Sequence, residues 1–130
     1  MKIIVASGST KGPANMFTGD VYFDVIVKGE APSRVRVNSV HFTPGARTAW
    51  HSHAVGQYLH VTEGIALVQE RSGKIKVLKP SDTIYMPPGA WHWHGTTEDN
   101  FMTHLAIWEA PESGPESNWG DLVTDEEYEQ

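Results

Sequence analysis

The chain has 130 residues, a formal net charge of −6 at pH 7 and a sequence pI near 5.5. Because nucleic acids and anionic membranes attract basic proteins, this acidic balance argues against both as partners. The absence of cysteine excludes disulfides and leaves nitrogen and oxygen atoms to ligate any metal. The opening residues, MKIIVASGST, hold an apolar run too short for a secretory signal, so we expect a cytoplasmic protein.

Short apolar runs rich in β-branched and aromatic residues recur along the chain, and turn signals such as TPGA, RSGK and PPGA separate them. We expect β-strands over seven segments: 21–27, 34–42, 57–63, 65–70, 74–78, 83–86 and 102–108. No long segment has helical periodicity, so the sequence predicts an all-β sandwich or barrel. The length fits a single domain over 1–130, with its core barrel at about 20–110.

The last part of the chain, 111–130, is expected to form an arm. Residues 109–120 are rich in Pro, Gly and Ser, which is typical of a linker or a wrapping segment. Thr124 and Glu127 then have the spacing of a helix capping box, with acidic residues at the positive end of the helix dipole. The chain therefore ends either in a short helix or in a frayed acidic tail, and the sequence favours neither.

Histidines lie in two pairs with the period of a β-strand. His51 and His53 are two residues apart, as are His92 and His94, so each pair shares one face. Gln57 opens the next strand after a turn that contains glycine. The sequence therefore predicts that these polar side chains converge inside the barrel.

The same alternation assigns faces on the neighbouring strands. If Gln57 faces inward, Leu59 and Val61 do as well. On the strand 102–108, His104 and Trp108 share a face. The opposite phase places the remaining histidines outside the barrel: His41 and His60.

The segment GARTAWHSHAVGQYLHVTEG (45–64) resembles the first motif of the cupin superfamily, which consists of small β-barrel or jelly-roll domains. Every spacing of that motif is present, although Gln57 stands where the motif has Glu. The segment PPGAWH (87–92) resembles the second motif. Ser81 and Thr96 depart from it, because they stand where the motif has Gly and Asn.

This resemblance implies one divalent transition metal ion per chain, held by His51, His53, Gln57 and His92. Glutamine in place of glutamate removes one negative charge, so the ion keeps its full +2 charge. We expect this to favour polarising or anion-binding chemistry over oxidation. Mn, Fe, Zn, Ni and Co are all compatible with such ligands.

A narrower resemblance rests on five segments, which are similar to segments of the bacterial cupin-type hydroxynitrile lyases and their uncharacterised relatives: GPANMFTG, PGARTAWHSHAVGQ, PPGAWHWHG, MTHLAIWE and LVTDEEY. It implies (R)-selective cleavage or formation of cyanohydrins with a bound manganese or similar ion. His94 is the expected base because it shares the inward face of His92, and His104 would orient it or share its proton. Strand phase and resemblance together give the expected pocket residues: Asn38, Val40, Thr48 and Trp108.

Three tryptophans alternate with the histidines and so point away from the metal: Trp50, Trp91 and Trp93. A monomer rarely exposes an apolar patch of this kind. We expect a second sheet, the N-terminal arm or another subunit to cover it, and the resemblance implies a homodimer or a homotetramer.

Two other functions stay open at this point. The first is a metal cupin dioxygenase, isomerase or decarboxylase that acts on a small oxygenated substrate, although Gln57 argues against oxidation. The second is a non-catalytic cupin that binds a small molecule. A non-catalytic binding protein does not need the extra titratable groups of His94 and His104, so we expect a metal-dependent lyase.

Overall fold

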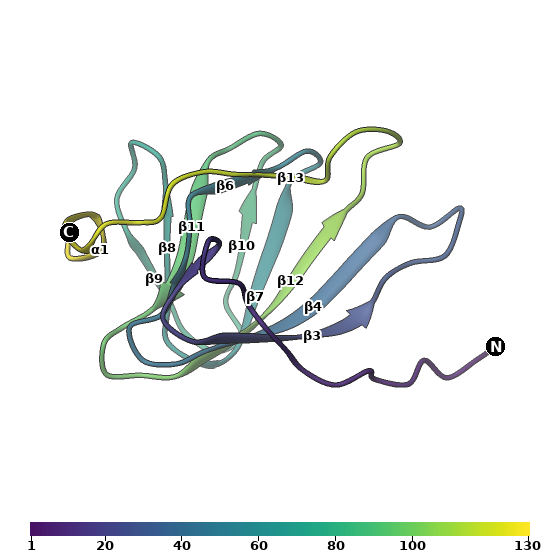
Figure 1. Ribbon diagram of the computed structural model, residues 1–130, viewed down its shortest axis with the longest axis horizontal. Coiled ribbons are helices and arrows are strands. Elements are labelled where there is room, and N and C mark those ends of the chain that lie inside the picture. Colours follow the sequence, from purple (N-terminus) through teal and green to yellow (C-terminus); the bar gives the residue numbers. More distant parts are fainter.

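The computed structural model describes all 130 residues, which form two antiparallel β-sheets curled into a barrel (Figure 1). In spatial order, the six-stranded sheet contains β1 (Thr10–Lys11), β3 (Val21–Val27), β4 (Val35–Phe42), β12 (Met102–Glu109), β7 (Gln57–Gly64) and β10 (Thr83–Met86). The path through the second sheet runs β13 (Ser117–Trp119), β6 (His51–His53), β11 (His92–Thr96), β5 (Arg47–Thr48) and β2 (Phe17–Thr18). This sheet also holds β8 (Ala66–Glu70), which pairs with β11 and with β9 (Lys76–Leu78). The predicted all-β barrel is confirmed.

Alternation along the central strands fills the interior of the barrel. On β7, Leu59 and Val61 are buried, whereas Tyr58 and Thr62 are exposed. Strand β12 lies between β4 and β7, and its inward Ala106 faces Leu59 across one pairing. Apolar side chains thus close one part of the interior, which leaves the other part to the histidines.

The C-terminal arm crosses the barrel and ends in the only helix, α1 (Asp125–Tyr128) (Figure 1). The capping box is present, because Thr124 Oγ1 accepts a hydrogen bond from the backbone N–H of Glu127 at 3.1 Å. The Glu127 carboxylate in turn accepts from the Thr124 N–H at 3.0 Å. The short helix is therefore present and the frayed-tail alternative is wrong. No helix in the structure is long and apolar enough to cross a bilayer.

The arm also covers the tryptophans on the outer face of the second sheet. Trp50 and Trp93 are buried in one cluster with Val123 and Tyr128, and Trp91 packs against it. The C-terminal arm therefore covers the tryptophans. The expectation that a second sheet, the N-terminal arm or another subunit would cover them is wrong. The physical reason lies in the anchoring of the arm: the Tyr128 hydroxyl donates to the backbone carbonyl of Thr96 at 2.5 Å.

Candidate metal centre

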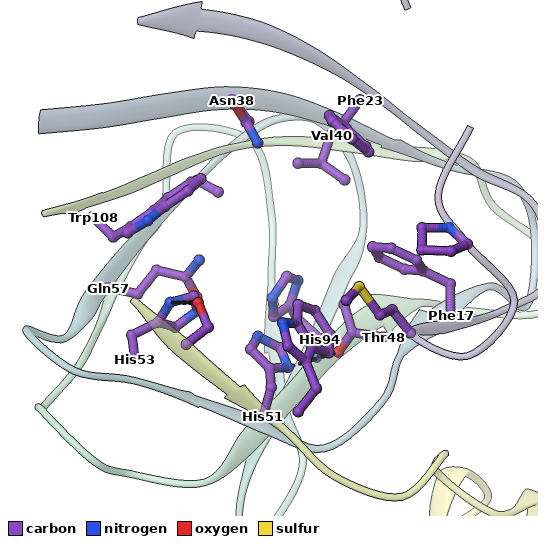
Figure 2. Close-up of a pocket in the computed structure, with 15 residues that line it drawn as sticks. Phe17, Phe23, Asn38, Val40, Thr48, His51, His53, Gln57, His94 and Trp108 are labelled. Carbon is purple, nitrogen blue, oxygen red and sulfur yellow. Dashed lines mark hydrogen bonds between the residues drawn. The ribbon is translucent and has the colours of Figure 1, made fainter. Parts of the chain in front are cut away.

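Three histidines meet at the point where β6 and β11 pair. His92 lies directly opposite His51 in the register, and His53 is two residues further along β6. One ring nitrogen from each lies within 4.8 Å of the others, and all three residues are buried. Figure 2 shows His51, His53 and Gln57 pointing into one cavity. Period-two spacing on two paired strands thus produces a group that can hold one metal ion.

Hydrogen bonds orient two of these rings. The Nδ1–H of His51 donates to the carbonyl of Ala49 at 2.8 Å, and that of His92 donates to the carbonyl of Ala90 at 3.0 Å. A carbonyl can only accept, so in the neutral rings the proton lies on Nδ1 and Nε2 carries the lone pair. The Nε2 atom of His53 is buried without any hydrogen-bond partner. The Nε2 lone pairs of these histidines are therefore available to bind a cation.

Gln57 supplies a further electron-rich atom beside this group. Its Oε1 lies 3.1 Å from Nε2 of His92. Because the proton of His92 is on Nδ1, these two atoms are both acceptors, and they repel each other unless a cation lies nearby. The donor set of imidazoles and an amide oxygen therefore fits a divalent transition metal.

Burial keeps the three imidazoles neutral. It holds the pKa of His51 well below 6.5, and the neighbouring His92 and His53 lower it further. Burial, followed by the effect of His92, lowers the pKa of His53 to about 4, and burial also lowers the pKa of His92. Neutral imidazole is the form that ligates metals, so the site is ready for an ion at pH 7 without loss of protons.

His51, His53 and Gln57 line a cavity of about 390 Å³ between the two sheets. The structure places all four expected pocket residues at its wall: Asn38, Val40, Thr48 and Trp108. In Figure 2, Trp108 lies with Gln57 and His53 at one end, and Phe17 lies with Thr48 at the other. The cavity has the size and the mainly apolar lining of a small-molecule site.

His94 and His104 form a buried pair beside the three-histidine group. His104 Nε2 lies 2.8 Å from His94 Nδ1, and only His94 reaches the cavity wall. Nε2 of His94 is buried without a partner. Burial, reinforced by His104, holds the pKa of His94 well below 6.5, and burial lowers that of His104 to about 3. The structure therefore directs one neutral imidazole at the cavity and places another behind it.

The outward histidines take no part in this site. His41 Nε2 lies 2.9 Å from an oxygen of Asp24, and His60 Nδ1 lies 2.8 Å from the Thr83 hydroxyl. Neither His41 nor His60 lines the cavity.

Sequence reasoning missed the residues that reach the site from both ends of the chain. Trp119 stacks on the His51 ring, with centroids 4.4 Å apart and planes 17° apart. Ser117 Oγ lies 3.1 Å from Nδ1 of His53, and Glu116 accepts a hydrogen bond from Trp108 Nε1 at 2.9 Å. Met16 and Phe17 come from the N-terminal side. Ser117 and Trp119 are two residues apart, which is the spacing of side chains on one face of a strand. This spacing was the one sign of a strand here, but the surrounding segment otherwise looks like a linker.

Comparison with known proteins finds one matching family model and one similar protein over nearly the whole chain. A family model described as a cupin domain matches residues 38–108. A protein named (R)-mandelonitrile lyase from Granulicella tundricola is 43% identical over 128 residues, covering 98% of this chain and 97% of its own length.

Solved structures agree in fold. A cupin-like protein from Thermotoga maritima has a TM-score of 0.86 and 40% identity, over 92% of this chain and 90% of that chain. The polyketide cyclase RemF from Streptomyces resistomycificus has a TM-score of 0.73 at 18% identity, over 99% and 91%, which shows a shared fold alone. The motif spacing, the barrel and the three-histidine group agree with these matches, and the chain belongs to the cupin family.

Proposed function

We propose that this cupin is a metal-dependent lyase that cleaves cyanohydrins such as (R)-mandelonitrile into an aldehyde and hydrogen cyanide, and forms them in reverse. One observation carries the proposal: two members of the three-histidine group, His51 and His53, line the same small, mainly apolar cavity as His94, whose Nε2 has no partner. The relative named (R)-mandelonitrile lyase, at 43% identity, supports the choice of reaction.

We propose manganese as the resident ion, held by Nε2 of His51, His53 and His92 and by Oε1 of Gln57. Bound there, a divalent ion would supply Lewis acidity and a site for an anion such as cyanide. Because the donor set contains no carboxylate, the ligands themselves neutralise none of the ion's charge. This is the property that a site for an anionic product requires.

His94 is the proposed general base. Its Nε2 takes the hydroxyl proton of the cyanohydrin while the carbon–oxygen bond becomes a carbonyl. The bond between that carbon and the nitrile carbon breaks, and its electron pair leaves with cyanide. The imidazolium of His94 then returns the proton to cyanide, so that one cyanohydrin gives one aldehyde and one hydrogen cyanide.

His104 sets the tautomer that this role requires. If the Nδ1–H of His94 donates to Nε2 of His104 across 2.8 Å, the lone pair of His94 lies on Nε2. The depressed pKa of His94 keeps that lone pair free of a proton at pH 7, because burial and His104 both disfavour the charged ring. His104 is thus a positioning residue and His94 the catalytic one.

Aromatic side chains at the two ends of the cavity determine which substituents fit. Trp108 and Phe17 lie at opposite ends, and Trp119 also lines the cavity. An aryl or alkyl group of the aldehyde half would replace water against these surfaces. This lining supports a small cyanohydrin with an apolar substituent.

We further propose a cytoplasmic homodimer or homotetramer. The absence of cysteine supports a reducing compartment. The strongly exposed Ile3, Ile4 and Val5 near the N-terminus form an apolar strip that supports contact with another copy. Light scattering of the purified protein gives the mass in solution, and a monomer would contradict the proposed assembly.

The test of the reaction is release of benzaldehyde from (R)-mandelonitrile by manganese-loaded protein and by the same protein after chelator treatment. We expect cleavage only in the loaded form and without oxygen consumption. Oxygen uptake with a small oxygenated substrate, together with no cleavage, would overturn the lyase proposal in favour of a dioxygenase.

A further inference from the structure

Strand β13 lies directly against β6, the strand that carries two of the proposed metal ligands. The pairing is antiparallel, with Ser117 opposite His53 and Trp119 opposite His51. Both of these β13 residues contact the imidazole that they face. Ser117 Oγ lies 3.1 Å from His53 Nδ1, and the Trp119 ring stacks on that of His51.

His53 differs from the other two histidines in how its ring is held. The Nδ1 atoms of His51 and His92 each face the backbone carbonyl two residues earlier, whereas Nδ1 of His53 faces only the hydroxyl of Ser117. A backbone carbonyl cannot be removed by substitution, but this hydroxyl can. Thr48 Oγ1 also lies 3.4 Å from Nδ1 of His51, but that atom keeps its backbone partner. His53 is therefore the one of the three histidines whose Nδ1 depends on a side chain alone.

We propose that Ser117 is a positioning residue of the metal centre: its hydroxyl accepts the Nδ1–H of His53 and so directs the Nε2 lone pair toward the ion. This inference rests on the metal centre of the proposed function. The partnerless Nε2 of His53 is the atom left for the metal once Nδ1 is occupied. Ser117 lies outside the segment that the cupin family model matches, so the C-terminal arm completes a centre built by the barrel.

Loss of the hydroxyl would leave a buried Nδ1–H without a partner, or would let the ring adopt the other tautomer. Either change lowers the population of rings that present Nε2 to the ion. Hydrogen-bond partners of metal-ligating histidines typically contribute about 10- to 100-fold in metal affinity. Backbone bonds hold the strand in place independently, since Ala54 N–H donates to Glu116 O at 2.9 Å and Gly120 N–H donates to Trp50 O at 2.7 Å.

The test is calorimetric titration of the metal-free full-length chain with Mn²⁺ in the absence of substrate. We expect Ser117→Ala to weaken binding by about 10- to 100-fold. Asn118→Ala is the matched control on the same strand, because Asn118 faces Ser52 rather than a ligand, and its affinity should equal that of the wild type. Ser117→Thr keeps the hydroxyl and should keep most of the affinity, whereas the equally branched Ser117→Val should lose it.

The outcomes separate this inference from the proposed function. If the wild type binds one Mn²⁺ and Ser117→Ala binds it equally well, the role of Ser117 is wrong and the metal centre stands. Equal losses in Ser117→Thr and Ser117→Val would also overturn the role, because shape rather than the hydroxyl would then be responsible. A wild type that binds no Mn²⁺ would overturn both. Thermal unfolding of each metal-free variant verifies that its fold is retained.

Discussion

The Nε2 atom of His104 lies 2.8 Å from Nδ1 of His94, in a pair that is buried beside the three-histidine group. Only the far nitrogen of His94 remains for the cavity. In the proposed function, this relationship separates the base, His94, from the metal ligands, three of which are also histidines.

Replacement of the proposed base should therefore separate catalysis from metal binding. We expect His94→Ala to lower kcat for mandelonitrile cleavage by about 10²- to 10⁴-fold, because that is the usual contribution of a general base. Manganese content should remain at the wild-type level, since His94 is not among the clustered ligands. His60→Ala, on the outer face, is the control for a histidine substitution. A variant that retains full activity would rule His94 out as the base.

The amide of Gln57 should matter through its lack of charge. Gln57→Glu places a carboxylate where Oε1 now lies 3.1 Å from His92 Nε2. We expect Mn²⁺ to bind about tenfold more tightly or better, because an added anion attracts the ion. Cleavage should slow, because the same charge repels cyanide and weakens the Lewis acid. Calorimetry and initial rates measure the two effects, and faster cleavage would contradict the role assigned to the neutral amide.

Trp108 should limit the size of the substrate. The centroid of the Trp108 ring lies 5.9 Å from that of the His53 ring. The Nε1–H of Trp108 donates to the carboxylate of Glu116, which also accepts a hydrogen bond from Arg36. Burial raises the pKa of Glu116, but hydrogen bonds from Trp108 and Arg36 outweigh this and keep it below its ordinary value, so the acceptor stays ionised.

We compare kcat/KM for bulkier cyanohydrins with kcat/KM for mandelonitrile. We expect Trp108→Ala to raise the ratio of the first to the second by about 10-fold or more. Phe101→Ala changes a residue that is 70% exposed and distant from the cavity lining, so it should leave the ratio unchanged. An unchanged ratio in Trp108→Ala would show that this residue does not limit the substrate.

Acid should destabilise the metal-free protein through its buried histidines. Burial lowers the pKa of His53 to about 4 and that of His104 to about 3, from 6.5 when unfolded. The unfolded chain therefore binds more protons below pH 6.5. The stabilisation is fully present above that pH and is lost as the pH falls toward 4 and then 3. Denaturant unfolding between pH 7.5 and 4 measures how the free energy of unfolding changes with pH. His104→Asn should reduce this pH dependence. Stability that rises on acidification would contradict these pKa values.

The barrel and the histidine group were predictable because both depend on period-two alternation. Leu59 and Val61 on β7, like His104 on β12, have the faces that this period assigns. The cupin spacings then added what alternation alone does not provide, namely that His92 meets His51 and His53 across a strand pair.

The remaining features depend on contacts between distant parts of the chain. Strand β13 has three residues in a segment rich in Pro, Gly and Ser, so it forms because β6 offers a free edge. The cover over Trp93 comes from Val123 and Tyr128, which no local pattern connects to it. Arg47 is buried because Asp125 and the carbonyl of Val123 pair with it, and all of these contacts reach across the fold.

The most direct test of the account is to titrate metal-free protein with Mn²⁺ while cleavage of (R)-mandelonitrile is measured at each point. The account predicts activity that rises in proportion to added metal and levels off at one ion per chain, as a single group of three histidines and one glutamine requires. Cleavage that is equally fast without metal would contradict the central claim, as would stoichiometric binding that never produces cleavage.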